Sequence, residues 1–89
     1  MTSRKTIDKA IALISAGWCQ RTFSKEIGKN EAYCLLGALN HVHTSAFLKG
    51  QVRNFIPKDF TGMVSWNDKP GRTKAEVIDL LDRVRATLV

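Results

Sequence analysis

Several features are scarce or missing in this chain, and each absence excludes a class of protein. Its 89 residues include only two prolines and two cysteines, Cys19 and Cys34. No apolar stretch approaches the ~20 residues that a membrane-spanning helix needs. The N-terminal segment offers no small-residue cleavage site, so the sequence predicts no secretory signal peptide. Two cysteines without an export signal indicate reduced thiols and a cytoplasmic protein.

Clusters of one charge sign are also missing. The chain carries 14 Lys and Arg against 8 Asp and Glu, which gives a net charge of +6. The longest basic run is the Arg4-Lys5 pair, so the positive charge is scattered. A scattered basic surface favours acidic partners in general and supports nucleic acid less strongly than a clustered one does. We therefore expect an acidic protein partner first and nucleic acid second.

Hydrophobic patterning predicts a mainly α fold, a compact single domain over residues 1–89 with three to four helices. The clearest helix is the last one, where Thr73 and Glu76 form a capping box before a regular apolar face. Residues 57 to 72 are expected to form a long loop before it, and such loops are often functional. The loop should pack inward through Phe60, Met63, Val64 and Trp66.

The earlier part of the chain is less regular. Apolar spacing predicts a first helix that begins at about Ser3 or Thr6 and ends at Ala16, and Gly17 should follow it as a left-handed stop. The segment 18–29 has no clear period, so an extended excursion turning at Gly28-Lys29-Asn30 and a single helical turn both fit it. A second helix, capped by Asn30 and reaching about Val42, is apolar nearly all round and should lie at the centre of the core.

Two details of this central region lead to further expectations. Gly37 lies inside the second helix, where we expect the close approach of another backbone that a side chain would block. Thr44 or Ser45 can cap a short third helix, which should end or kink near Gly50. Pro57 rules out further regular helix beyond it.

Four side chains could in principle bind a metal: Cys19, Cys34, His41 and His43. Their spacing matches no usual zinc pattern, and on a regular helix the two histidines point to different sides, so no metal and no cofactor are predicted. A Cys-His-Asn enzyme would combine a cysteine and a histidine with Asn67 or Asp68. Cys34 lies within the apolar helix, where a thiol is inert, whereas Cys19 is more accessible. A thiol-dependent enzyme using Cys19 is therefore the third hypothesis.

A helix-turn-helix over residues 22–40 is one form that DNA binding could take. Lys29 stands where a hydrophobic residue normally packs, and the helix that would enter the major groove lacks a polar face. The pattern therefore argues against sequence-specific DNA reading.

The stretch from Ser65 to Val77 is the densest candidate site. After a Pro-Gly turn, Gly71–Lys74 places free backbone N–H groups, a hydroxyl and two cations at a helix N-terminus, where anions bind. The alternative is local: Asn67 and Asp68 hydrogen-bond their own loop, and Arg72 pairs with Asp68. The candidate ligand-binding residues are Trp66, Asn67, Asp68, Lys69, Arg72 and Lys74.

Three runs of the sequence resemble a family of small uncharacterised proteins from bacteria and their phages. They are Gly17-Trp18-Cys19-Gln20, the Cys-x-x-Gly-Ala pattern beginning at Cys34, and Trp66-Asn67-Asp68-Lys69-Pro70-Gly71-Arg72-Thr73. The resemblance spans residues 7 to 88 and departs from the family over 21–29. It implies no activity.

These observations support a ranked set of functions. The leading hypothesis is a non-enzymatic cytoplasmic interaction module that binds an acidic protein partner. A phage-type accessory factor would be a protein of this kind. The alternative is nucleic-acid or phosphate-ligand binding through the basic surface and Gly71–Lys74. The thiol-dependent enzyme stands third.

Overall fold

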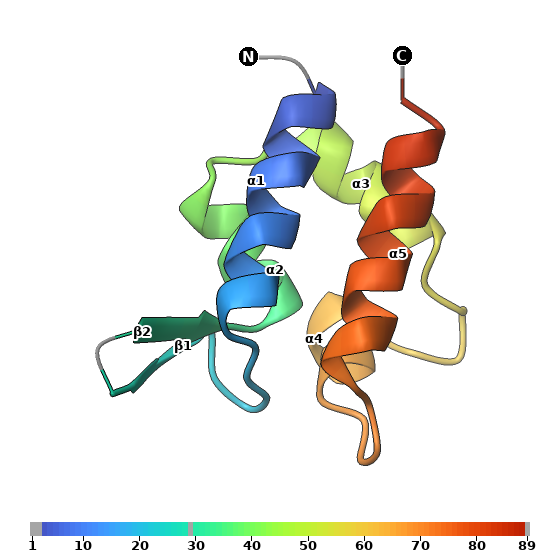
Figure 1. Cartoon of the computed structure of the whole chain (residues 1–89). Helices are drawn as coiled ribbons and strands as arrows, with labels where there is room; N and C mark the ends of the chain where they lie inside the picture. The colour runs from blue at the N-terminus through green and yellow to red at the C-terminus, as the bar shows by residue number, and fades with distance from the viewer. Residues whose placement is uncertain (1–2, 29, 89) are drawn as a thin grey trace.

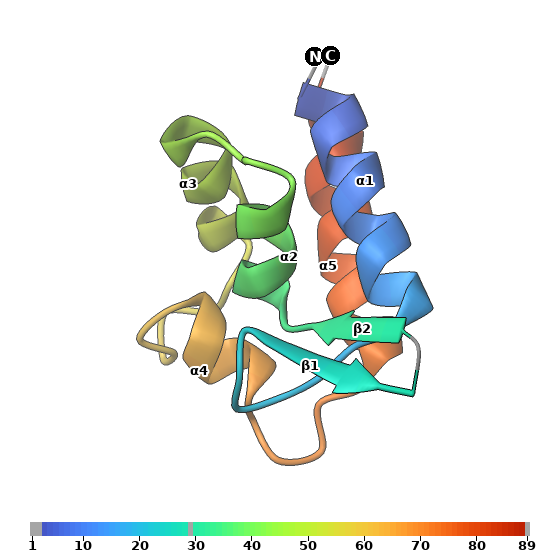
Figure 2. The same cartoon turned by 90° about the vertical axis from the view of Figure 1, so that its left-hand side faces the viewer.

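The last helix of the chain packs along the first one, and the other elements surround this pair. The computed structural model describes residues 3–28 and 30–88. Its elements in those ranges are α1 (Ser3–Ala16), β1 (Ser24–Ile27), β2 (Asn30–Tyr33), α2 (Leu35–His41), α3 (Ala46–Asn54), α4 (Met63–Asn67) and α5 (Lys74–Ala86). Figure 1 and Figure 2 show α1 and α5 side by side and antiparallel. The expectation of a mainly helical fold is confirmed, with five helices and one hairpin in the described ranges.

A single apolar core joins α1, α2, α3 and α5. Its largest fully buried hydrophobic side chains are Ile7, Ile14, Leu35, Leu39, Val52, Val77, Leu80, Leu81 and Val84. The radius of gyration is 12.0 Å. A compact chain of this length should give about 12 Å, so the elements are closely packed. No helix in the described ranges is long and apolar enough to cross a membrane.

The segment after α1 is extended. Of the two conformations expected for residues 18–29, an extended excursion and a single helical turn, the first is therefore confirmed. β1 pairs antiparallel with β2, and Ser24 lies opposite Tyr33. Gly28 has the positive φ of a turn residue, at +64°, while Lys29 lies outside the described residues. Figure 2 shows this hairpin at one end of the helices, beyond the N-terminal end of α2.

Asn30 begins β2 and does not cap a helix, so the expected start of the second helix was wrong. The second edge of β2 pairs with the chain that leaves α1, since Tyr33 N–H donates to Gly17 O at 3.0 Å and Cys19 N–H donates to Tyr33 O at 3.2 Å. Backbone pairing on both edges keeps this segment extended. The helix therefore begins only at Leu35, although it is central and buried as expected.

Two glycines are required by close backbone contacts. Gly17 does not have the left-handed conformation that the sequence suggested. A Cβ atom there would lie 3.0 Å from Glu31 O, so the residue has to be small where β2 crosses the chain. The expectation for Gly37 is confirmed, because a Cβ atom on it would lie 2.0 Å from Phe23 O.

The region between α3 and α5 is more ordered than a loop. Ser45 caps α3 by accepting from Leu48 N–H at 3.2 Å, and the helix passes Gly50 without ending there. The expected loop over 57 to 72 contains α4, whose first turn is held by a hydrogen bond from Gly62 N–H to Ser65 Oγ at 3.1 Å. Of the residues expected inside, Trp66 is buried and Phe60 and Met63 are half-buried, but Val64 is 40% exposed.

Candidate functional site

Asn67, one of the predicted site residues, is fully buried at the end of α4. Its Oδ1 accepts from Trp18 Nε1–H at 2.8 Å and from Leu35 N–H at 3.0 Å. Its Nδ2 donates to Cys19 O at 3.1 Å and to Asp68 Oδ1 at 3.0 Å. An amide side chain has two donors and an acceptor oxygen with two lone pairs, so every position is used. Asn67 therefore joins α4 to the start of α2 and to the chain that follows α1.

The neighbouring side chains complete this contact, which we call the Asn67 junction (residues 18–21, Leu35 and 67–69). Gln20 Nε2 donates to Asn67 O and to Lys69 O, both at 3.0 Å. Arg21 N–H donates to Asp68 Oδ1 at 2.9 Å. Asn67 and Asp68 were expected to hydrogen-bond within their own loop, but most of their partners are distant in sequence. The Trp-Asn-Asp motif and the Gly-Trp-Cys-Gln motif are thus hydrogen-bonded to each other.

The side chain of Arg72 is held by contacts with residues near it in sequence. Its Nε–H donates to Trp66 O at 2.9 Å, and Nη1 pairs with Glu76 Oε2 at 3.0 Å. The guanidinium carbon lies 4.0 Å from the centroid of the Trp66 ring and 5.7 Å from that of Phe60. Only 8% of the side chain is exposed. The expected pair with Asp68 was wrong, because Asp68 faces Arg21 whereas Glu76, one helical turn along α5, reaches the guanidinium.

The N-terminus of α5 carries an internal carboxylate where an external anion would bind. Glu76 Oε1 accepts from Thr73 N–H at 2.9 Å, and Glu76 N–H donates to Thr73 Oγ1 at 3.2 Å, which confirms the capping box. The Thr73 backbone N–H, followed by the Thr73 hydroxyl and Arg72, lowers the pKa of Glu76. Lys74 Nζ donates to Ser15 O at 3.0 Å. Among the six predicted ligand residues, the side chains of Trp66 and Lys69 make no hydrogen bond or ion pair within the described ranges, although the Trp66 ring contacts Arg72.

The two thiols do not resemble catalytic nucleophiles. Cys19 is the more accessible thiol, as expected, but it is only 8% exposed against 3% for Cys34. Cys34 caps α2 by accepting from Gly37 N–H at 3.3 Å. Burial raises the pKa of both thiols, which favours the unreactive protonated form. In the ranges that the structure describes, no three His, Cys, Asp or Glu side chains are grouped to hold a metal ion.

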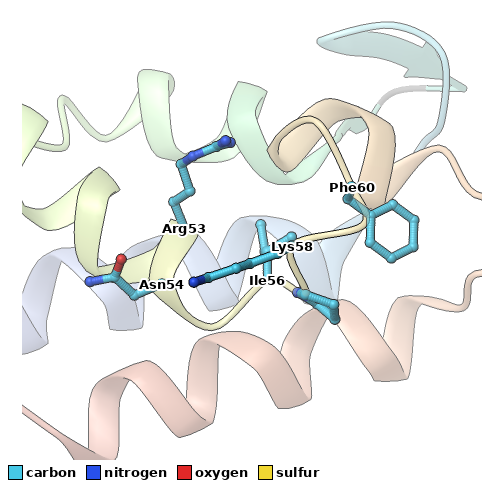
Figure 3. Close-up of a pocket in the computed structure, with 6 residues that line it drawn as sticks. Arg53, Asn54, Ile56, Lys58 and Phe60 are labelled. Carbon is cyan, nitrogen blue, oxygen red and sulfur yellow. The ribbon is translucent and has the colours of Figure 1, made fainter.

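A different surface has basic side chains that the chain does not neutralise. A hollow of about 260 Å³ lies between the end of α3 and the connection to α4. We call it the basic hollow, and its lining residues are Arg53, Asn54, Ile56, Pro57, Lys58 and Phe60. In Figure 3, Phe60 lies on the opposite side of the hollow from Arg53 and Asn54. The lining contains two cations, an amide and an aromatic ring, and no carboxylate.

The position of Arg53 depends on a glycine in the next loop. A Cβ atom on Gly62 would lie 2.8 Å from Arg53 Nη1, so the guanidinium rests over this residue just before α4. Arg72, Arg83 and Arg85 form ion pairs, whereas Arg53 and Lys58 form none within the described ranges. The lining of the basic hollow therefore carries two cations without a paired carboxylate.

A second hollow of about 380 Å³, on the other side of Pro57, makes the contrast clear. It also contains two arginines, Arg72 and Arg83, but each is paired with a carboxylate of α5. Glu76 pairs with the first and Asp79 with the second, so this hollow is balanced in charge. Unbalanced positive charge distinguishes the basic hollow.

Sequence reasoning did not identify the basic hollow. Arg53 and Lys58 belong to no motif, and Phe60 was expected to be fully inside. The available signal was the long segment before the last helix, together with Pro57 as the end of the preceding helix. Which side chains meet around Pro57 depends on how that segment turns back into α4.

Comparison with known proteins places the chain in a family. Residues 1–87 match the profile described as Family of unknown function (DUF6197), and the chain belongs to that family. Searches of curated proteins and of solved structures found no match.

Proposed function

We propose that this protein is a non-enzymatic interaction module that binds an acidic protein partner at the basic hollow. The observation that carries the proposal is the pair of cations, Arg53 and Lys58, in a hollow that the half-buried Phe60 also lines and that no carboxylate lines. Arginine and aromatic side chains are enriched at protein interfaces and among their most important contacts. The net charge of +6 would also attract an acidic partner during encounter.

The geometry suggests how an acidic segment would bind. A carboxylate can accept two parallel hydrogen bonds from a guanidinium, and Arg53 is the guanidinium at this surface. An apolar neighbour in the partner could cover Ile56, Pro57 and the Phe60 ring. Because Gly62 allows Arg53 to rest against the loop, less side-chain freedom is lost on binding.

The same proposal places the protein in the cytoplasm, as a small accessory factor of the phage type. Two free cysteines support a reducing compartment. The resemblance to small bacterial and phage proteins supports an accessory role.

Nucleic acid or another phosphate-bearing ligand is the second candidate. Arg53 and Lys58 could bind phosphate oxygens, and the Phe60 ring could stack against a base. The start of α5 favours this candidate less, because the carboxylate of Glu76 already accepts from its N–H groups.

The test is the capture of a partner from a host lysate by the immobilised protein. The amount captured is compared between the wild type and two double variants. Arg53→Gln with Lys58→Gln removes the cations of the basic hollow. Arg4→Gln with Lys25→Gln removes the same charge from exposed positions on α1 and β1. We expect a partner retained by the wild type and the control but reduced about tenfold by the hollow variant, as for loss of a buried charge pair. Equal retention by all three proteins would refute the basic hollow as the site.

Nuclease treatment and salt separate the two candidates. A protein partner should survive nuclease digestion of the lysate. A nucleic acid should not, and its affinity should fall steeply with salt because counterions are released on binding. Capture that disappears with nuclease would replace the leading proposal with the second candidate.

A further inference from the structure

A hollow between α1 and the turn after α2 contains both histidines of the chain. Its volume is about 460 Å³, within the range of small-molecule sites. We call it the histidine hollow, and its lining residues are Lys9, Ala12, Leu13, His41, Val42 and His43. The histidines were expected on different sides of a helix, but α2 ends at His41 and the chain turns at His43. The turn brings both imidazoles to the same hollow.

The backbone at His43 does not require a histidine. Its φ is +56°, in the left-handed region that glycine and asparagine adopt most readily. The turn is held by backbone bonds, from His43 N–H to Asn40 O and from Thr44 N–H to Leu39 O, both at 3.0 Å. Asparagine could make the same bonds in this conformation, so the imidazole can be replaced while the turn is kept.

His41 is oriented by a chain of hydrogen bonds from β2. The Tyr33 hydroxyl donates to Glu31 Oε2 at 2.7 Å, and its oxygen lies 3.4 Å from His41 Nδ1. The bond to Glu31 raises the pKa of Tyr33, so the hydroxyl keeps its proton. Since that proton points to Glu31, the Tyr33 oxygen can accept from Nδ1–H. This arrangement leaves Nε2 of His41 for another partner.

The lining combines apolar and basic side chains. The apolar ones are Ala12, Leu13 and Val42, and the basic ones are Lys9 and the two imidazoles. No carboxylate lines the hollow. Lys9 is the one lysine or arginine of the lining, and the two imidazoles add ring nitrogens that can hydrogen-bond. A singly charged anion with an apolar body fits this set better than a phosphate does.

We propose that the histidine hollow binds a small carboxylic acid with an apolar body, such as a medium-chain fatty acid. The carboxylate lies between Lys9, His41 and His43, and the hydrocarbon covers Leu13 and Val42. This inference goes beyond the proposed function, since it concerns another surface and another class of ligand. Charge complementarity and pocket size carry it.

The direct test is a titration of the full chain followed by its amide NMR shifts. Octanoate is the probe, acetate supplies the charge without the apolar body, and octanol supplies the apolar body without the charge. We expect octanoate to shift the amides of Leu13, Val42 and His43, and the other two to bind about tenfold more weakly. Octanol binding as tightly as octanoate would overturn the proposal.

A double variant tests the imidazoles without disturbing the turn. His43→Asn retains a residue that accepts positive φ, and His41→Gln changes an exposed position. Unchanged thermal unfolding checks that the variant is folded. We expect octanoate binding about tenfold weaker in this variant, and unchanged in Arg53→Gln with Lys58→Gln. Equal affinity in the histidine variant and the wild type would overturn the assignment.

A Glu-rich peptide distinguishes a small carboxylic acid from an acidic protein segment as the ligand of the histidine hollow. If a Glu-rich peptide shifts the same amides and octanoate does not, the hollow binds protein and the proposal fails.

Discussion

Two arginines beside the same aromatic ring have opposite environments. Arg72 stacks over Trp66 and Phe60, pairs with Glu76 and is 8% exposed. Arg53 lines the basic hollow, as Phe60 does, but Arg53 is exposed and has no ion pair within the described ranges. Arg72 belongs to the most recognisable motif of the sequence, and Arg53 belongs to none. The comparison shows that Arg72 holds the motif segment in place, whereas Arg53 carries a positive charge without an ion pair in the described ranges.

The largest expected effect comes from breaking the Asn67 junction. Asn67→Ala should lower the free energy of unfolding by about 3 kcal/mol, because it leaves buried groups of Trp18, Cys19 and Leu35 without a partner. Chemical denaturation measures this loss. Lys69→Ala, in the same segment, is the control and should stay within about 0.5 kcal/mol of the wild type. Equal stability of the two variants would contradict the structural role of the junction.

The two arginines should differ in the same measurement. Arg72→Ala should cost about 2 kcal/mol, since a nearly buried guanidinium loses its hydrogen bonds and its stacking on Trp66. Arg53→Ala should change stability by less than about 0.5 kcal/mol but weaken partner capture. If Arg53→Ala proves as destabilising as Arg72→Ala, the two environments are not distinct and the basic hollow is structural.

Gly62 offers a way to disturb Arg53 without changing its charge. The backbone there is extended, with φ of 173°, so alanine is sterically allowed. Its Cβ atom would meet the end of a flexible side chain, and we expect a stability change below about 1 kcal/mol. Capture of the partner should still fall, because the guanidinium moves from its place over residue 62. Unchanged capture would show that this position of Arg53 is not needed for binding.

The smallest effect concerns pH and the carboxylate that neutralises Arg72. The pKa of Glu76 is lowered in the folded protein, so its contribution to stability is present above the ordinary glutamate pKa, about 4.3. That contribution is lost as the pH falls below this value. Glu76→Gln should therefore show a shallower loss of stability in acid than the wild type, measured by denaturation between about pH 6 and about pH 3. If stability falls equally with pH in Glu76→Gln and in the wild type, the loss of stability in acid comes from other groups.

Part of the candidate site could be recognised from the sequence. Thr73 and Glu76 form the capping box that their spacing indicated, and Gly37 meets a backbone as its position in an apolar helix suggested. The sequence also indicated that residues 66–73 form a distinctive motif, but it did not indicate that these residues join distant segments of the fold. Asn67 bonds mainly to segments 32 to 49 residues away. No local rule predicts such partners.

What the sequence by itself determined is the local structure with short-range causes. The body of α1 follows from its apolar period and the start of α5 from its capping box, because those interactions lie within a few residues of each other. The tertiary structure decided the rest. Asn30–Tyr33 is a strand since both of its edges find backbone partners, and Asn67 is structural since three distant segments meet at its amide. Within the described residues no carboxylate forms an ion pair with Arg53, and a pattern of neighbouring residues cannot show that.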